Sequence, residues 1–320
     1  MKEQISIDRQ KKSINWLSLF TNVFPFLGLV FVIVFFSIVT DGKLTNSKNI
    51  TRIIIQSLPM FIGTIGASFV FSQNILDMSM GSVLGLAAVS AAYASQVDPM
   101  LSIIAALVVG IAIGYLNGYL HGVLKINPLI ATMAVSFIIR GMLQPICDYG
   151  SVGLSTVVVN WNNNTLKTSI VLVVFIFAYV LFEYTGLGKK CKIVGSSEIA
   201  ATQSGINVKK IKITGYVITG LAAGLAGFLT VLRSGAALPA TGNLFEFDVV
   251  IALVLGGMPI TGGSESRIRS ALIGTLILTI LTNGMTIWGI EEYPQQITKG
   301  LIFLIVLAIS FAFKTKLRSI

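Results

Sequence analysis

A short polar segment interrupts the apolar sequence near residue 75. In "SQNILDMSMGS" it places Gln73, Asn74 and Asp77 between two long apolar runs. A carboxylate inside a bilayer costs about 2.5–3.5 kcal/mol on insertion scales, so Asp77 needs either a partner or a function there. Two interpretations stay open: Asp77 caps the next helix at the membrane surface, or the segment is a helix break that lines a transport path.

Single asparagines lie within two later apolar runs, at Asn117 and Asn283. An asparagine in a membrane helix more often hydrogen-bonds a neighbouring helix than a substrate. Each of these two residues therefore has a structural interpretation, as a contact between helices, and a functional one, as a contact with a substrate. For Arg140, well inside another apolar run, we expect main-chain carbonyl groups of a neighbour as partners rather than a ligand. The predicted residues of a translocation path are Gln73, Asn74, Asp77, Asn117 and Asn283.

The sequence contains no pattern for covalent catalysis. It has no HExxH, and no GxSxG in a strand–turn–helix context. The nearest match to a phosphate-binding loop is "EYTGLGKK", in which Glu183 replaces the first glycine and Lys190 replaces the Ser or Thr. His121 is the only histidine, which leaves no partner for a metal cluster. We therefore expect no catalytic residue, no cofactor and no metal, and any ATP must be bound by another chain.

A second polar segment, "VGSSEIAATQSGINVKKIK", lies in the longest basic connection, at about residues 187–212. Ser196 or Ser197 is typical of a helix N-cap, Glu198 is favourable in the first turn, and Gly205 suits the C′ position. The helix between them has about two turns, far below the roughly 12–15 residues needed to persist alone. It must therefore dock on a partner, and we predict a coupling site formed by Glu198, Ala200, Ala201, Ser204 and Gly205.

Membrane helices are the elements that must position these residues. Of the 320 residues, 54% are hydrophobic and only 11% are charged, too few for the surface of a soluble domain. Apolar runs of about 20 residues, long enough to cross a hydrocarbon core of about 30 Å, recur along the whole chain. They predict an all-α polytopic membrane protein, a single transmembrane domain over residues 1–320, with about ten crossing segments: 20–39, 51–72, 79–97, 100–123, 128–148, 166–186, 211–233, 246–258, 268–288 and 296–313. The eighth segment is short and runs into "LGGMPITGGSES", which indicates a re-entrant or broken helix.

The basic residues are concentrated on alternate connections. Six lysines lie in the segment 187–212 alone, and others flank both ends of the chain. This asymmetry predicts that both termini and the coupling segment are cytoplasmic. It also explains the net charge of +10, so we expect contact with membrane lipid and none with nucleic acid. The longest connection on the other side, about residues 148–166, has almost no charge and either caps the outer mouth or carries a short extra helix.

Several residues recur at matching positions in the two halves of the chain. Asn117 and Pro128 recur in the second half as Asn283 and Pro294, with a step of eleven residues both times, and Asp77 has a counterpart at residue 248. Five crossings separate the matching residues, and an odd number reverses direction, so the pattern predicts a weak inverted repeat, with coincidence as the alternative.

Glycines four residues apart at 110, 114, 118 and 122, and a second set in "GLAAGLAG", predict close helix packing.

Several longer stretches resemble one family. They are "LDMSMGSVLGL", "INPLIATMAVSFIIRG", "EIAATQSGINVKKIK", "GLAAGLAGFL", "LGGMPITGG" and "NGMTIWGIEEYPQQITKGLIFLIV". Together, from about Ser57 to Phe313, they resemble the permease subunits of binding-protein-dependent ABC importers, in the branch for ribose and simple sugars. The resemblance implies a second permease chain, two cytoplasmic ATP-binding subunits and an extracytoplasmic substrate-binding protein in a bacterial inner membrane. The helix at Glu198–Gly205 then corresponds to the family's contact with the ATPase.

Alternatives remain for the substrate and for the energy source. A nucleoside, a branched-chain amino acid or a furanosyl signal molecule can replace a ribose-like monosaccharide, and the second permease chain can be identical or different. A self-sufficient secondary transporter is the rival from another class. It would need ion-coupling carboxylates or a proton relay in the membrane, and beyond Asp77 the candidates are few.

Overall fold

The structure, a computed structural model, describes the backbone of residues 16–318 and the side chains of residues 23–308. It is an all-α bundle with one two-residue antiparallel strand pair, in which Val152 faces Ala237. Its elements in chain order are α1 (Trp16–Val39), α2 (Ser47–Phe71), α3 (Met80–Val97), α4 (Pro99–Gly122), α5 (Pro128–Ile146), β1 (Val152–Gly153), α6 (Thr156–Val159), α7 (Asn164–Tyr179), the π-helical turn η1 (Val180–Tyr184), α8 (Gly186–Ser196), α9 (Glu198–Gln203), α10 (Val208–Ser234), β2 (Ala236–Ala237), α11 (Phe245–Leu255), α12 (Arg269–Ile287) and α13 (Glu292–Arg318).

A helix occupies each of the ten predicted crossing segments. Among residues 23–308, seven are able by length and composition to span a membrane: α2, α3, α4, α5, α7 with η1, α10 and α12. The other three segments hold the short α11 and the helices α1 and α13, each of which extends beyond residues 23–308. The eleven residues of α11 rise only about 16 Å, roughly half of a bilayer core, so the predicted short eighth segment is confirmed. The connection at residues 148–166 contains the short extra helix α6.

Local sequence sets the starts of several helices. The Asn46 side chain accepts the main-chain N–H of Lys48 at the start of α2. Asp98 does the same for Met100 before α4, and Asn127 for Leu129 before α5. Both α4 and α5 begin with proline, whose missing N–H costs nothing in the first turn. These caps explain why the observed bounds lie within a few residues of the predicted ones.

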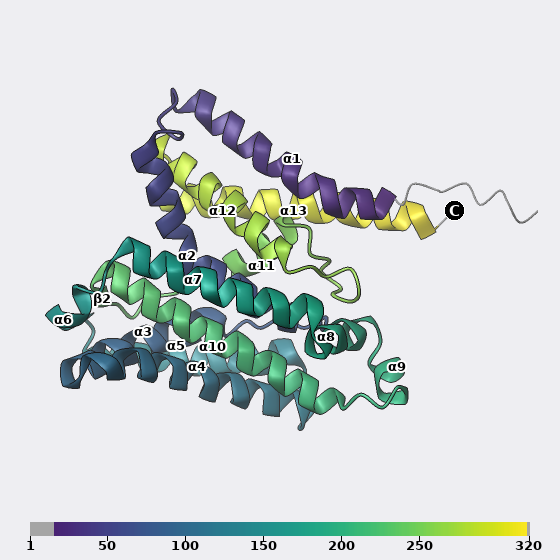
Figure 1. Ribbon diagram of the computed structural model, residues 1–320, viewed down its shortest axis with the longest axis horizontal. Helices are drawn as coiled ribbons and strands as arrows, with labels where there is room; N and C mark the ends of the chain where they lie inside the picture. Colours follow the sequence, from purple (N-terminus) through teal and green to yellow (C-terminus); the bar gives the residue numbers. More distant parts are fainter. Residues whose placement is uncertain (1–15, 319–320) are drawn as a thin grey trace, which may run out of the picture.

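The centre of the bundle is α10, which packs against α2, α3 and α4. It meets α4 along the glycine faces that the sequence indicated: Gly110 lies against the main chain of Gly220 and Gly224, and Gly114 lies against Tyr216. With no side chains between them, the two backbones approach closely and gain dispersion contacts along their length. Figure 1 shows α4 and α10 running side by side.

The helix contacts repeat between the two halves. The packing of α10 on α3 and α4 has a counterpart in the packing of α2 on α11 and α12. Likewise, the contacts of α3 with α4 and α5 match those of α11 with α12 and α13. In each case the corresponding helices of the two halves are five predicted crossings apart, as an inverted repeat requires.

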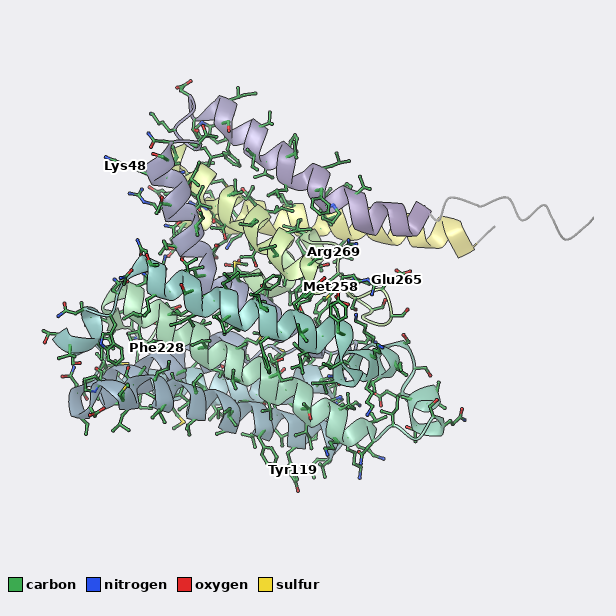
Figure 2. The ribbon with its side chains drawn as sticks, in the orientation of Figure 1. Lys48, Tyr119, Phe228, Met258, Glu265 and Arg269 are labelled. Carbon is green, nitrogen blue, oxygen red and sulfur yellow. The ribbon has the colours of Figure 1, made fainter. Side chains whose placement is uncertain are left out.

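The two ends of the bundle carry different elements. The start of α1 and the end of α13 lie at the same end as α8 and α9, whereas α6 and the strand pair lie at the other (Figure 1). Figure 2 shows Glu265 and Arg269 toward the end with α8, and Lys48 at the opposite end. The candidate functional residues divide between these two ends.

Candidate functional site

The two-turn helix α9 has the ends that the sequence predicted. The Ser197 hydroxyl oxygen accepts the N–H of Ala200 at 3.2 Å and so caps the helix. Gly205 has φ +75°, the left-handed conformation expected after a helix C-terminus. The N–H of Ile206 donates to the Ala201 carbonyl and that of Gly205 to Thr202, both at 3.0 Å, which completes a Schellman motif. The helix is therefore specified by its own caps.

The side chains of the predicted coupling site differ in exposure. Ala200, Ser204 and Gly205 are exposed, whereas Ala201 is fully buried within the chain. Glu198 forms an ion pair with Lys212 at 2.6 Å, which fastens α9 to the start of α10. Ile199, which lies beside Ala200 in the same helix, is 73% exposed. A partner would meet Ile199, Ala200, Ser204 and Gly205, while Ala201 and Glu198 hold α9 in place.

Three connections meet directly behind α9. The N–H of Gly263, between α11 and α12, donates to the carbonyl of Ser72, between α2 and α3, at 2.8 Å. The N–H of Ser264 donates to the hydroxyl of Ser196, the last residue of α8, at 3.2 Å. Gly262 has φ +59°, and a Cβ there would press on the carbonyls of Ser72 and Phe71. We call this contact of residues 72–74, 195–196 and 262–264 the three-loop junction.

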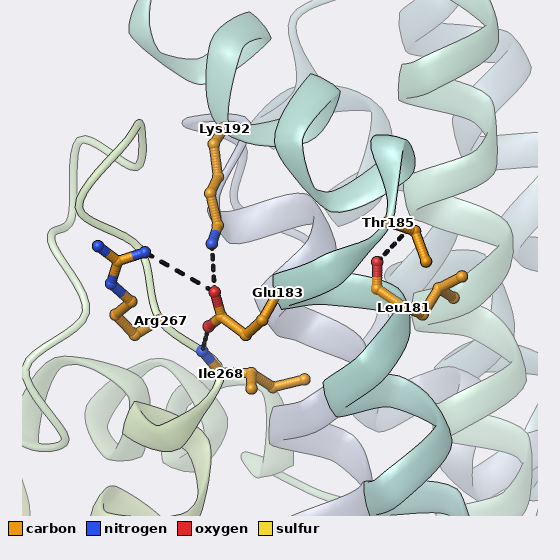
Figure 3. A network of polar contacts seen from close by, with 6 residues as sticks. All are labelled: Leu181, Glu183, Thr185, Lys192, Arg267 and Ile268. Carbon is orange, nitrogen blue, oxygen red and sulfur yellow. Dashed lines mark hydrogen bonds and ion pairs between the residues drawn. The ribbon is translucent and has the colours of Figure 1, made fainter.

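Glu183 anchors the same region from the end of the π-helical turn (Figure 3). One carboxylate oxygen lies 2.7 Å from the Lys192 ammonium of α8 and 3.8 Å from the Arg267 guanidinium. The other accepts the N–H of Ile268 at 2.8 Å. The Glu183 and Lys192 side chains are only 14% and 10% exposed, so solvent screens their interaction weakly. Glu183 thus joins α7, α8 and the connection before α12.

Replacing Glu183 by glutamine is expected to destabilise the chain by about 1–3 kcal/mol. The amide oxygen still accepts the N–H of Ile268, but Lys192 loses the opposite charge at a largely buried position. The free energy of unfolding in detergent measures this. The matched control is Glu291→Gln, because Glu291 is exposed and forms no ion pair with the described residues. Equal unfolding free energies for the two variants would contradict the anchoring role of Glu183.

Asp77 is buried and lies two residues before Ser79, the N-cap residue of α3. Its carboxylate accepts the N–H of Ser79 at 2.9 Å and the Ser79 hydroxyl at 2.6 Å, while Asn117 of α4 donates to that hydroxyl at 2.7 Å. Gln73 is also buried and donates to the Phe69 carbonyl, whereas Asn74 is exposed with φ +61°. The structure therefore brings Asp77 and Asn117 together on the hydroxyl group of Ser79, just before α3.

Asn283 lies far from these residues, between α12 and α2. It accepts a hydrogen bond from the Asn49 side chain at 2.9 Å, and its own amide faces the Gln56 oxygen at 3.5 Å. It also lines an open cleft of about 620 Å³ with polar residues that the sequence prediction missed. The available signal was the spacing of Thr275, Thr279, Thr282 and Thr286, three or four residues apart in one membrane helix.

Three other ionisable residues inside the bundle, Arg140, Asp248 and Lys299, have partners. As expected, Arg140 donates to main-chain carbonyls, those of Thr241 and Gly242 at 2.9 and 2.6 Å. Asp248 of α11 pairs with Lys299 of α13 at 2.6 Å, which the sequence prediction did not foresee. Within the described part of the chain, no group of three or more His, Cys, Asp or Glu residues could hold a metal ion.

Comparison with known proteins gives a consistent result. Residues 49–310 match the family described as branched-chain amino acid transport system / permease component. A ribose import permease protein of Bacillus subtilis (strain 168) is 33% identical over 312 residues, which cover 93% of this chain and 95% of that protein. A ribose import permease protein of Escherichia coli (strain K12) is 31% identical over 274 residues, covering 82% and 85% of the two chains. A D-allose transport system permease protein of the same strain is 31% identical over 309 residues, 94% of each. No solved structure matches the chain.

Proposed function

The chain belongs to this permease family, and from that membership we propose that it is the transmembrane subunit of an ABC importer for a ribose-like monosaccharide. Its relatives named for ribose and allose import cover nearly the whole chain, which supports a sugar over the other substrates considered. The chain itself catalyses no covalent step. It supplies the path, and ATP is hydrolysed by separate subunits.

We assign α9 as the contact with a cytoplasmic ATP-binding subunit. The observation that carries this assignment is a helix of only six residues that is closed by its own caps, exposes Ile199, and lies at the end of the bundle (Figure 1). The lysines around it favour a cytoplasmic position for this end, together with both termini, under the positive-inside rule. The opposite end then receives an extracytoplasmic binding protein, and a second permease chain completes the path in the bacterial inner membrane.

The three-loop junction is the means by which α9 acts on the rest of the chain. It joins the end of α8 to the connection after α2 and to the connection before α12. A displacement of α9 would therefore move segments in both halves of the bundle. ATP binding elsewhere shifts the balance between inward-open and outward-open states only if the ATPase binds the two states with different affinity. The junction has one main-chain hydrogen bond, one hydrogen bond to the Ser196 hydroxyl and close contacts of Gly195 and Gly262 with the Ser72 carbonyl, and we infer that these contacts transmit that difference.

Reconstitution tests this function directly. We expect proteoliposomes containing this chain, its ATP-binding subunit and D-ribose-loaded binding protein to accumulate D-ribose only when ATP is supplied. The control is the chain alone under a proton or sodium gradient. Uptake in that control would favour the secondary transporter, and ATP-driven uptake of leucine in place of D-ribose would identify an amino-acid importer.

A further inference from the structure

The cleft at the end opposite α9 has the dimensions of a small-molecule site. It lies between α2, α10, α12 and α13 and has a volume of about 620 Å³, within the range of about 300–1,000 Å³ that is usual for ligand pockets. A smaller hollow of about 340 Å³ adjoins it and shares Arg52, Gln56 and Arg233 as lining residues. The cleft shares no lining residue with α9 or with the three-loop junction.

Hydroxyl and amide groups form its inner wall. Thr279, Thr282 and Thr286 of α12 follow one another at steps of three and four residues, so they share one face of the helix. Opposite them, α2 contributes Gln56 and α13 contributes Gln295. Such a polar face costs free energy in a membrane helix unless it meets water, a partner or a ligand.

The hydrogen-bonding state of these groups leaves positions for a ligand. The Thr282 hydroxyl donates to the Leu278 carbonyl at 3.0 Å, and its oxygen keeps both lone pairs free. The Thr286 hydroxyl donates to the Thr282 carbonyl at 2.9 Å and accepts from Gln295 at 3.1 Å, so its oxygen keeps one lone pair free. Thr279 is 6% exposed, and its hydroxyl forms no hydrogen bond with the described residues. Gln295 uses its amide group on Thr286 and Ile290, which leaves its oxygen as an acceptor. The wall therefore accepts more hydrogen bonds than it donates.

A neutral ligand with several hydroxyl groups fits this wall. Each of its hydroxyls can donate to a threonine or amide oxygen and accept from an amide N–H or a guanidinium. The charged residues of the cleft, Arg52, Arg233 and Glu292, are all exposed, and the threonine and amide groups of the inner wall carry no charge. A ligand held by its carboxylate would need a cation at that depth.

We propose that this cleft is a receiving site for a neutral monosaccharide within a single permease chain, with Thr279 and Thr282 as hydrogen-bond partners of the sugar hydroxyls. The proposal rests on the function proposed above. It assigns to one chain, at the mouth of the path, the place where sugar released by the binding protein is first held.

The test removes both hydroxyls without changing side-chain shape. In proteoliposomes holding the complete transporter and D-ribose-loaded binding protein, we expect Thr279→Val with Thr282→Val to lower the ribose taken up per ATP hydrolysed by about tenfold, since each hydrogen bond contributes roughly 2- to 10-fold. ATP hydrolysis should stay within about twofold of the unchanged transporter, because α9 and the three-loop junction are untouched. Serine at both positions should restore uptake.

The matched control is Thr168→Val with Thr230→Val. These threonines donate to the carbonyl four residues back, as Thr282 does, but they lie outside the cleft. Three results would overturn the proposal: unchanged ribose per ATP in the cleft variant, an equal loss in the control, or a fall in ATP hydrolysis that matches the fall in uptake. The first leaves the proposed function intact. If the unchanged transporter carried no neutral monosaccharide at all, the proposed function would fall as well.

Discussion

Alanine in place of Gly220 is expected to destabilise the folded chain by about 3 kcal/mol, the upper end of the range for overpacked cores. A Cβ at this position meets the carbonyl oxygen of Gly110 and lies 2.9 Å from the Cα of Gly114. These are main-chain atoms of a long helix, so they cannot rotate away as a side chain would. Helix α4 would have to separate from α10 along its length, and the close contact between the two backbones would be lost.

A thermal melt of the detergent-solubilised chain, followed by circular dichroism, measures this effect. Gly141→Ala is the matched control, because Gly141 is also in a membrane helix but has nothing within 4 Å of its Cβ position. We expect that variant to be as stable as the unchanged chain or up to about 1 kcal/mol more stable, because alanine favours a helix more than glycine does. If Gly220→Ala melted like Gly141→Ala, the close approach of α4 and α10 would not be a source of stability.

The periodic features of this fold were predictable from the sequence. Ten apolar segments gave ten helices, since a run long enough to cross lipid must satisfy its own main-chain groups. The ends of α9 were predictable because Ser197 and Gly205 act on their own neighbours. The glycine faces of α4 and α10 were each visible, but the sequence did not show that they face one another.

Contacts between distant residues were beyond the reach of sequence patterns. The Glu183 anchor joins residues 183, 192 and 267, and in the sequence Glu183 stood out only as a mismatch to a phosphate loop. Ser196 looked like an alternative cap for α9, whereas its hydroxyl accepts the N–H of Ser264. Asp248 and Lys299 gave no sign of pairing, because 51 residues separate them. Each of these depends on which helices become neighbours.

The predicted translocation residues show a different kind of limit. Asp77 and Asn117 meet because α3 and α4 pack together, whereas Asn283 lies at the other end with Asn49. The sequence singled out these residues by polarity alone, and polarity does not distinguish a cap from a path. The threonines of α12 were missed because a threonine hydroxyl in a membrane helix usually donates to a carbonyl of its own helix. Its presence in an apolar run therefore does not by itself indicate a site.

Aspartate in place of Ile199 is expected to abolish ATP-driven sugar uptake while leaving the chain folded. The Ile199 side chain is 73% exposed and takes no part in the caps at Ser197 and Gly205, so α9 should keep its shape. Burying an isoleucine in an interface contributes about 1.5–3 kcal/mol, and losing it weakens binding roughly 10- to 100-fold. A buried aspartate without a partner weakens it further. Co-purification of the ATP-binding subunit with the permease measures the loss.

Val157→Asp is the control, because Val157 is a 52% exposed aliphatic residue on α6 at the opposite end of the bundle. Its variant should keep the ATP-binding subunit bound. Ala201→Asp cannot serve as the test, since Ala201 is fully buried and a charge there would disrupt α9 itself. The contrast between positions 199 and 157 therefore separates contact with a partner from damage to the chain. Full association and uptake in Ile199→Asp would show that the ATPase engages some other surface, and the three-loop junction behind α9 would then have no part in coupling.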